Sequence, residues 1–368
     1  MSAKSRETKV SMLRQVVAGV FCDVRFVLLA GVSLFVQAAS VDVNDCLSIK
    51  EDSARLACYD AIAGRLAPNS ETQTTQPAAS NNQTPTPQLA EAPPENVNNA
   101  VSPLSKRWEL DDADKTGIFA IRPYQPIYLM PLHYTYSINT RPTSPAPDHS
   151  VILPRDYGKA EVKYQLSFKT KILERVLFDR ADLWFGYTQQ SLWQVYNKKQ
   201  SSPFRETNYE PELMLVMPTK YRLFGLEGRL LSAGVKHQSN GQSEPRSRSW
   251  NRFYTQVGFE RDGFVLLLEP WWRIPEHNHD DNPDITDYIG RGKILASYQS
   301  NGNQWTLQVK NNFKSTDNRG SVQLNWSYPL VSGLRGYLEF FSGYGESLID
   351  YNHRQRTFGL GVLLVDWM

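Results

Sequence analysis

His237, Ser239 and Asn251, here called the candidate triad, are the residues whose types and spacing best fit catalytic chemistry. His237 and Ser239 lie two positions apart at the end of a strand-like run, so their side chains should point to the same face. An imidazole beside a hydroxyl can remove its proton and turn the serine into a nucleophile. Asn251 opens the next strand-like run and could hold the imidazole in position. Spacing alone also fits a serine and a histidine that are ordinary polar residues at the rim of a sheet.

The elements that must position the candidate triad are strands. In residues 105–368, apolar and polar residues alternate over segments of about ten residues, and turn signals separate the segments. Short and long connections also alternate, which is typical of bacterial outer-membrane barrels. We therefore predict an all-β domain that forms a twelve-stranded antiparallel transmembrane β-barrel, although a soluble β-sandwich fits the same periodicity. The predicted strands are 124–136, 159–171, 182–195, 207–220, 224–239, 249–260, 263–274, 285–299, 304–313, 319–328, 334–343 and 356–367.

Strand parity predicts which way the candidate triad faces. Val235 shares its parity with the histidine and the serine, and Phe253 shares its parity with the asparagine; both rows are largely apolar. Lys236 lies on the opposite, polar face. In a barrel the apolar face meets lipid and the polar face lines the lumen. We therefore expect the candidate triad to lie outside the barrel near its outer rim, where a substrate dissolved in the bilayer could reach it.

The N-terminal part of the chain reads as three segments. Residues 1–40 have a basic start, an apolar core and a small-residue cleavage point, as a signal peptide does. A single membrane anchor is the alternative, but the apolar core is shorter than the ~20 residues that a span needs. Residues 41–65 hold Cys46 and Cys58 with helical spacing, and an even cysteine count in an exported chain suggests one disulfide. Residues 66–104, rich in Pro, Asn, Gln and Thr, are predicted to be a disordered linker.

The overall composition excludes few classes of protein. The formal net charge is +2, so nothing in the balance of charges indicates a nucleic acid partner. Aromatic residues make up 12% of the chain, which fits a soluble enzyme as well as a barrel with a polar interior. His277 and His279 could bind a transition metal, but two histidines in an acidic loop are a weak pattern.

Four stretches of the chain carry a specific likeness to a known family: 201–211 (SSPFRETNYEP), 237–254 (HQSNGQSEPRSRSWNRFY), 280–286 (DDNPDIT) and 342–352 (SGYGESLIDYN). Together they resemble the outer membrane phospholipase A family, and the second contains the whole candidate triad. They occur in a consistent order, and the similarity covers roughly residues 115–368. The resemblance implies a twelve-stranded barrel that hydrolyses acyl esters of phospholipids and lysophospholipids, with phospholipase A1 and A2 activity, in the outer leaflet of the bacterial outer membrane.

The resemblance also implies residue roles and partners. Ser239 corresponds to the nucleophile, His237 to the general base and Asn251 to the residue that orients the base. Activity would need Ca²⁺ and the reversible formation of a homodimer, and the N-terminal extension would lie in the periplasm. Gln189 matches a polar position of the dimer interface, where an outward glutamine would gain from pairing with its partner. Without the resemblance, Gln189 could equally be a rim or lumen residue.

The calcium positions implied by the resemblance are oxygen donors in the long loops. They comprise the hydroxyl of Ser247, the backbone carbonyls of Ser201 and Gln242, and the carboxylates of Glu244 and Asp281. Hard oxygen ligands of this kind suit Ca²⁺, which could polarise a water that helps to stabilise the oxyanion. Glu244 stands where the family usually has aspartate, and Gln242 where it usually has arginine. Without the resemblance, Ser247, Glu244 and Asp281 would be read as solvated loop residues.

Two other functions fit the sequence less well. A non-catalytic outer-membrane barrel, porin-like or structural, would carry the same strands around a decayed site. A soluble periplasmic esterase would carry the same Ser–His pair without a barrel. The intact candidate triad, together with the calcium positions, favours the phospholipase.

Overall fold

The computed structural model describes residues 102–276, 280–331 and 333–367, together with Arg55. The chain separates into two compact units, residues 1–93 and residues 94–368. The predicted signal peptide, the segment with Cys46 and Cys58, and the predicted linker as far as residue 101 lie outside the described residues, apart from Arg55. No helix among the described residues is both long and apolar enough to cross a membrane.

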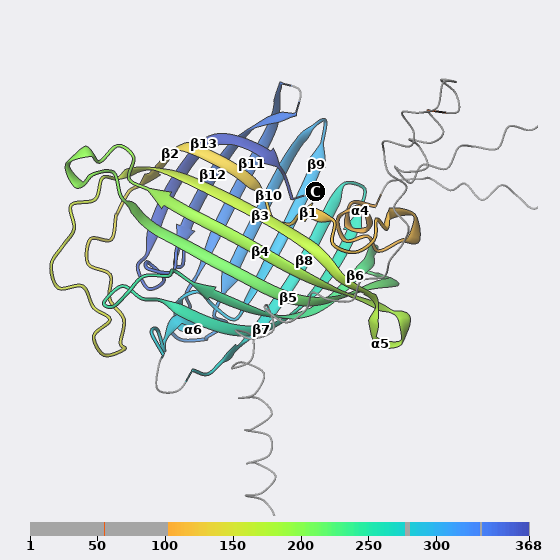
Figure 1. The fold of residues 1–368 in the computed structure, drawn as a ribbon, viewed down its shortest axis with the longest axis horizontal. Helices are drawn as coiled ribbons and strands as arrows, with labels where there is room; N and C mark the ends of the chain where they lie inside the picture. The colour runs from red at the N-terminus through yellow and green to blue at the C-terminus, as the bar shows by residue number, and fades with distance from the viewer. Residues whose placement is uncertain (1–54, 56–101, 277–279, 332, 368) are drawn as a thin grey trace, which may run out of the picture. The chain divides into compact units, whose positions relative to one another are not determined.

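Within residues 94–368, twelve strands of the described chain form a closed antiparallel β-barrel (Figure 1). Each strand pairs with its neighbour in sequence, and the last pairs with the first to close the ring. A short additional strand, β1 (Ile121–Pro123), pairs with residues 168–170 of the second barrel strand, beyond the stretch of that strand that pairs with the first. The predicted barrel is therefore confirmed. Its strands are β2 (Ile127–Thr135), β3 (Ala160–Arg175), β4 (Ala181–Trp193), β5 (Phe204–Leu223), β6 (Leu226–Ser239), β7 (Ser249–Arg261), β8 (Phe264–Ile274), β9 (Gly292–Ser300), β10 (Asn303–Asn311), β11 (Gly320–Val331), β12 (Leu334–Gly343) and β13 (Gln355–Val365).

The two faces of the barrel wall differ as strand alternation requires. Outside, Val235 and Phe253 are 47% and 40% exposed. Inside, Lys236 is 3% exposed and its ammonium lies 3.3 Å from a carboxylate oxygen of Glu212 and 3.7 Å from one of Glu269. Buried charges persist in a protein only when they are paired in this way. An apolar exterior around an ionic interior is the pattern of an outer-membrane barrel, not of a soluble β-sandwich.

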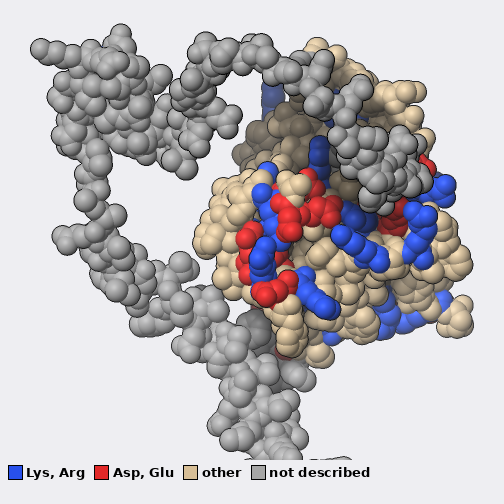
Figure 2. Space-filling model, turned by 90° about the vertical axis from the view of Figure 1, so that its right-hand side faces the viewer, with Lys and Arg blue, Asp and Glu red and all other residues tan. Residues whose placement is uncertain are grey.

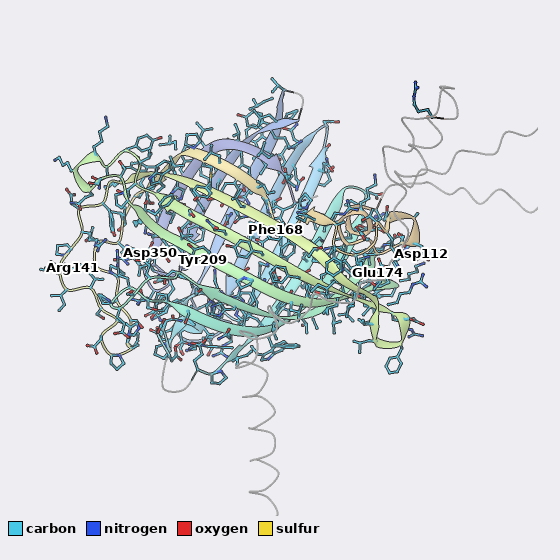
Figure 3. The ribbon with its side chains drawn as sticks, in the orientation of Figure 1. Asp112, Arg141, Phe168, Glu174, Tyr209 and Asp350 are labelled. Atoms are coloured by element: carbon cyan, nitrogen blue, oxygen red, sulfur yellow. The ribbon has the colours of Figure 1, made fainter. Side chains whose placement is uncertain are left out.

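Long and short connections lie at opposite ends of the barrel because consecutive strands are antiparallel. The long connections follow β2, β4, β6, β8, β10 and β12, and we call their side the loop end. The other side, the turn end, carries α5 (Val176–Asp179) and the tight turns. A 3₁₀ helix, η3 (Lys198–Gln200), lies in one of the loops. In Figure 3, Arg141 and Asp350 mark the loop end, Phe168 and Tyr209 the wall, and Asp112 and Glu174 the turn end.

One predicted strand, 285–299, begins later than expected. Its first residues form the short helix α6 (Ile285–Tyr288), and β9 starts only at Gly292. Ile285 and Ile289 are both buried in the main apolar cluster. Apolar residues four positions apart share one face of a helix. The prediction of a strand over these residues is therefore wrong, because their spacing buries them as a helical turn at the barrel mouth.

The turn end is filled by a helix that precedes the barrel. Helix α4 (Pro103–Trp108) begins after Ser102, whose side-chain oxygen accepts a hydrogen bond of 3.0 Å from the Ser105 N–H. Leu104 and Trp108 are buried in the main apolar cluster, and the Lys169 ammonium lies 3.2 Å from the Trp108 ring centroid. A 3₁₀ helix, η2 (Asp112–Asp114), follows. Figure 2 looks onto this end of the molecule and shows acidic and basic side chains lying next to one another.

Candidate active site at the loop end of the barrel

The candidate triad lies where β6 and β7 meet the loop end. Ser239 is the last residue of β6, and Asn251 is near the start of β7. The β6–β7 register sets His237 directly opposite Asn251. All three side chains are half-buried and share the outward faces of Val235 and Phe253. The structure thus gives these residues the orientation that strand parity predicted.

The His237 imidazole is held by an amide. Its Nδ1 lies 2.8 Å from Oδ1 of Asn251. Because an amide oxygen only accepts hydrogen bonds, this contact requires the proton to be on Nδ1 and leaves the Nε2 lone pair free. A free Nε2 is what a general base for a hydroxyl needs. Among the described residues, no hydrogen bond joins the imidazole to Ser239, so the serine hydroxyl is not yet engaged by the base.

Glu276 extends the arrangement by one residue, and the sequence reasoning missed it. The Asn251 side-chain nitrogen Nδ2 donates a hydrogen bond of 2.5 Å to Oε1 of Glu276. Burial raises the pKa of Glu276, and nearby Arg273 opposes that shift. The signal that could have found it is not local: Glu276 follows the end of β8, and only the pairing of β8 with β7 brings that end beside Asn251.

The predicted calcium positions are brought together in part. The Ser247 hydroxyl donates a hydrogen bond of 2.6 Å to Oδ2 of Asp281. The Gln242 side chain donates to Glu206, which leaves its backbone carbonyl, the predicted ligand, outside this contact, and Ser201 and Glu244 are exposed. Hydroxyl, carboxylate and carbonyl oxygens are the donors that Ca²⁺ prefers, so the residues present fit this ion chemically.

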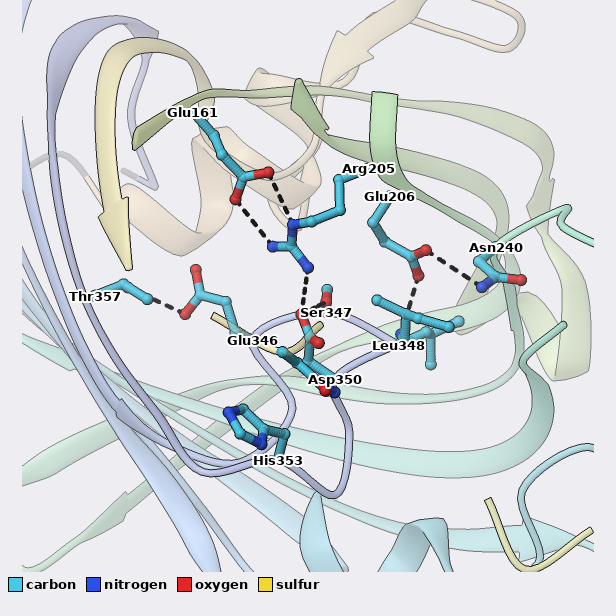
Figure 4. Close-up of polar contacts among 12 residues, drawn as sticks. Glu161, Arg205, Glu206, Asn240, Glu346, Ser347, Leu348, Asp350, His353 and Thr357 are labelled. Atoms are coloured by element: carbon cyan, nitrogen blue, oxygen red, sulfur yellow. Dashed lines mark hydrogen bonds and ion pairs between the residues drawn. The ribbon is translucent and has the colours of Figure 1, made fainter. Parts of the chain in front are cut away.

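Buried Asn240 anchors the loop that joins β6 to β7. Its Oδ1 accepts hydrogen bonds from the backbone N–H groups of Arg248 at 3.0 Å and Gln242 at 3.3 Å. Its Nδ2 donates to the Arg246 carbonyl at 2.8 Å and to Oε2 of Glu206 at 3.3 Å. One side chain therefore closes the loop on itself, and its contact with Glu206 ties the loop to β5 (Figure 4).

A second buried cluster lies next to this anchor, because Arg205 precedes Glu206 in β5. The Arg205 guanidinium donates to both carboxylate oxygens of Glu161, at 2.8 and 3.0 Å, and to Asp350 at 2.6 Å (Figure 4). Glu206 accepts the backbone N–H of Ile349 at 3.0 Å. The stretches 201–211, 237–254 and 342–352 therefore meet in one polar network. The fourth stretch joins through Asp284, which accepts a hydrogen bond of 2.5 Å from the Tyr351 hydroxyl.

Gln189 lies on the outer wall of β4. Its neighbours in register are Leu166 of β3 and Tyr209 of β5, both exposed. The Tyr187 hydroxyl donates to Oε1 of Gln189 at 3.2 Å, and Nε2 donates to Ser191 at 3.4 Å. Gln189 is therefore not a lumen residue, and it offers a polar patch on an otherwise apolar wall.

The structure bears on only one of two other metal candidates. His277 and His279 lie outside the described residues. Among the residues that the structure does describe, His133, Glu339 and Glu346 converge within 4.8 Å in the lumen. The ammonium of Lys163 lies 2.7 Å from Glu339 and 2.6 Å from Glu346. The lysine thus already supplies the positive charge that a metal would bring.

Comparison with known proteins gives a consistent result. The family described as Phospholipase A1 matches residues 104–364. Phospholipase A1 of Escherichia coli K12 is 40% identical over 248 residues, which are 67% of this chain and 82% of that protein. A relative from Neisseria meningitidis serogroup B is 38% identical over 370 residues, 94% of this chain and 96% of its own length. The N-terminal extension is thus included in a match to a known relative.

Solved structures agree with the sequence matches. Outer membrane phospholipase A from Escherichia coli superposes with a TM-score of 0.62 at 38% identity, covering 69% of this chain and 95% of that one. The outer membrane phospholipase of Salmonella typhi, solved as a dimer with bound calcium, has a TM-score of 0.62 at 37% identity over the same shares.

Proposed function

Because the chain belongs to the phospholipase A1 family, we propose that it hydrolyses acyl esters of phospholipids and lysophospholipids with Ser239 as nucleophile. His237 acts as general base, and Asn251 orients it. The observation that carries this proposal is the 2.8 Å contact between Nδ1 of His237 and Oδ1 of Asn251 on the outer face of the barrel. The fold and the family make the chain an outer-membrane enzyme; the residue roles are our assignment.

The proposed reaction follows from the tautomer that Asn251 selects. Nε2 of His237 removes the proton of Ser239 as Oγ attacks the ester carbonyl carbon. The same nitrogen then returns the proton to the leaving alcohol of the lipid, which leaves an acyl-serine. A water activated by His237 hydrolyses that ester and frees the fatty acid. The amide oxygen of Asn251 stabilises the imidazolium at each step, although less than a carboxylate would.

The direction of the candidate triad supports a lipid substrate. The three side chains share the face of Val235 and Phe253, which meets lipid in a barrel of this kind. Long loops face outwards in bacterial outer-membrane barrels. We therefore place the ester in the outer leaflet and the N-terminal extension in the periplasm. A porin-like role is disfavoured, because α4 fills the turn end and ion pairs such as that of Lys236 with Glu212 fill the lumen.

Calcium and a homodimer belong to the same proposal. Ser247 and Asp281, with the Ser201 and Gln242 carbonyls and Glu244, would hold Ca²⁺. The ion would polarise a water that stabilises the oxyanion. Support comes from the hydroxyl–carboxylate contact of Ser247 with Asp281 and from the calcium-bound dimer of the Salmonella typhi protein. Gln189, a polar group on the outer wall, would pair across the dimer axis.

The test is lipid hydrolysis by refolded protein in detergent, with Ca²⁺ or with EDTA. We expect Ser239→Ala to abolish turnover while the barrel keeps its heat-modifiable migration on gels. EDTA should also stop the wild-type protein. Full activity in the Ser239→Ala protein would overturn the nucleophile assignment, and an inactive wild-type barrel with Ca²⁺ would favour the non-catalytic alternative.

A further inference from the structure

Glu276 stands directly behind the proposed base and its orienting residue. Nδ2 of Asn251 donates a hydrogen bond of 2.5 Å to Oε1 of Glu276, while Oδ1 of the same amide lies 2.8 Å from the His237 imidazole. Carboxylate, amide and imidazole therefore form one line of hydrogen bonds on the outer face of the barrel. The roles proposed for the candidate triad do not require a carboxylate at the end of this line.

The backbone sets Glu276 in this position. Ile274, the last residue of β8, pairs in register with Asn251, and its side chain is exposed on the outer face. Side chains two positions apart in an extended segment point to the same side. Glu276 therefore projects towards Asn251. Pro275, which has no N–H to donate, ends the β8 ladder between them.

The chemistry of the amide gives Glu276 a consequence. An asparagine amide can turn over and exchange its oxygen with its nitrogen, and only its partners decide which orientation persists. An ionised carboxylate only accepts hydrogen bonds, so it must face the NH₂ group. With Glu276 in place, turning the amide would set oxygen against oxygen and would present NH₂ to the imidazole N–H. Both hydrogen bonds would be lost.

The surroundings leave the Glu276 carboxylate free for this task. The Arg273 guanidinium donates instead to the Asp280 carboxylate at 2.5 Å and to the Pro283 carbonyl at 2.8 Å. Burial raises the pKa of Glu276; the charge of Arg273 and the hydrogen bond from Asn251 act against that rise, while Asp280 adds to it. The amide of Asn251 is thus the partner that Glu276 holds by a direct hydrogen bond.

We propose that Glu276 is a positioning residue for the hydrolysis: by accepting the Asn251 N–H it locks the amide with its oxygen towards His237. This inference rests on the proposed function. Glu276 does not touch the substrate. It acts through Asn251, so that the imidazole carries its proton on Nδ1 before the ester arrives.

Three variants test the inference by kcat and KM in detergent with saturating Ca²⁺. Glu276→Ala should lower kcat roughly tenfold with little change in KM, as expected for the loss of one hydrogen bond to a charged group. Glu276→Gln keeps an acceptor oxygen and should recover to within about threefold of wild type. In an Asn251→Ala background, Glu276→Ala should have almost no further effect, because the residue through which it acts is gone.

Each result can overturn the inference. An unchanged kcat in Glu276→Ala would do so, as would an equal loss in Glu276→Gln or a full extra loss in the Asn251→Ala background. Heat-modifiable migration checks that each barrel is folded, and the Gln variant is close to isosteric. An active Ser239→Ala protein would overturn the proposed function itself. An inactive Ser239→Ala protein beside a fully active Glu276→Ala protein would remove only the role of Glu276.

Discussion

Replacing Asn240 by alanine should weaken activation by calcium without unfolding the barrel. The substitution removes two hydrogen bonds of 2.8 and 3.0 Å and two longer ones of 3.3 Å. At about 1 kcal/mol for each short bond and about half of that for each long one, the loop loses about 3 kcal/mol of ordering free energy. The backbone hydrogen bond from the Asn240 N–H to the Arg248 carbonyl remains, so this figure is an upper bound. We expect the half-activating Ca²⁺ concentration to rise by roughly ten- to one hundredfold.

The assay is a calcium titration of lipid hydrolysis by the refolded protein in detergent. Asn318→Ala is the matched control, because Asn318 is an exposed loop asparagine that donates to Asn311 at 3.0 Å and to the Lys314 carbonyl at 3.2 Å, away from the predicted calcium ligands. It should leave the titration unchanged. A shift of less than about twofold in Asn240→Ala, or an equal shift in Asn318→Ala, would refute the claim that Asn240 orders the calcium loop.

Two further substitutions test the scaffold and the dimer. Arg205→Ala leaves Glu161 and Asp350 as unpaired buried charges and should lower the free energy of unfolding by about 3–5 kcal/mol. Urea unfolding in detergent measures this loss, and an unchanged unfolding midpoint would contradict the prediction. Gln189→Leu removes a polar group from the outer wall and should reduce cross-linking of the homodimer in detergent with Ca²⁺, whereas cross-linking at the wild-type level would exclude Gln189 from the interface.

The barrel could be predicted from the sequence because the alternation of apolar and polar residues that marks each strand is a local pattern. Side chains alternate along a strand whatever its partners are, so an apolar row ending in His237 and Ser239 had to face lipid once a barrel was assumed. The same rule set Lys236 in the lumen, where the structure finds it. Register then brought Asn251 opposite His237, as adjacent strands joined by one loop allow.

The features that could not be predicted depend on contacts between distant segments. Glu276 belongs to no periodic pattern, and its position beside Asn251 depends on the pairing of β8 with β7. Ile285 and Ile289 share one parity, as residues of a strand face do, but they are also four positions apart, and burial at the barrel mouth selects the helical turn. Helix α4 did have a local signal, with Ser102 before a proline and apolar residues four apart, but it stood at the end of a linker-like composition.

The outward direction of the candidate triad changes how this enzyme meets its substrate. On the proposed assignment, neither lipid nor fatty acid passes through the lumen; both arrive and leave sideways by diffusion in the plane of the membrane. The relevant substrate concentration is therefore a mole fraction in a two-dimensional film. Adding detergent while the bulk concentration of lipid stays constant should therefore slow turnover, because it lowers the mole fraction of lipid around the enzyme.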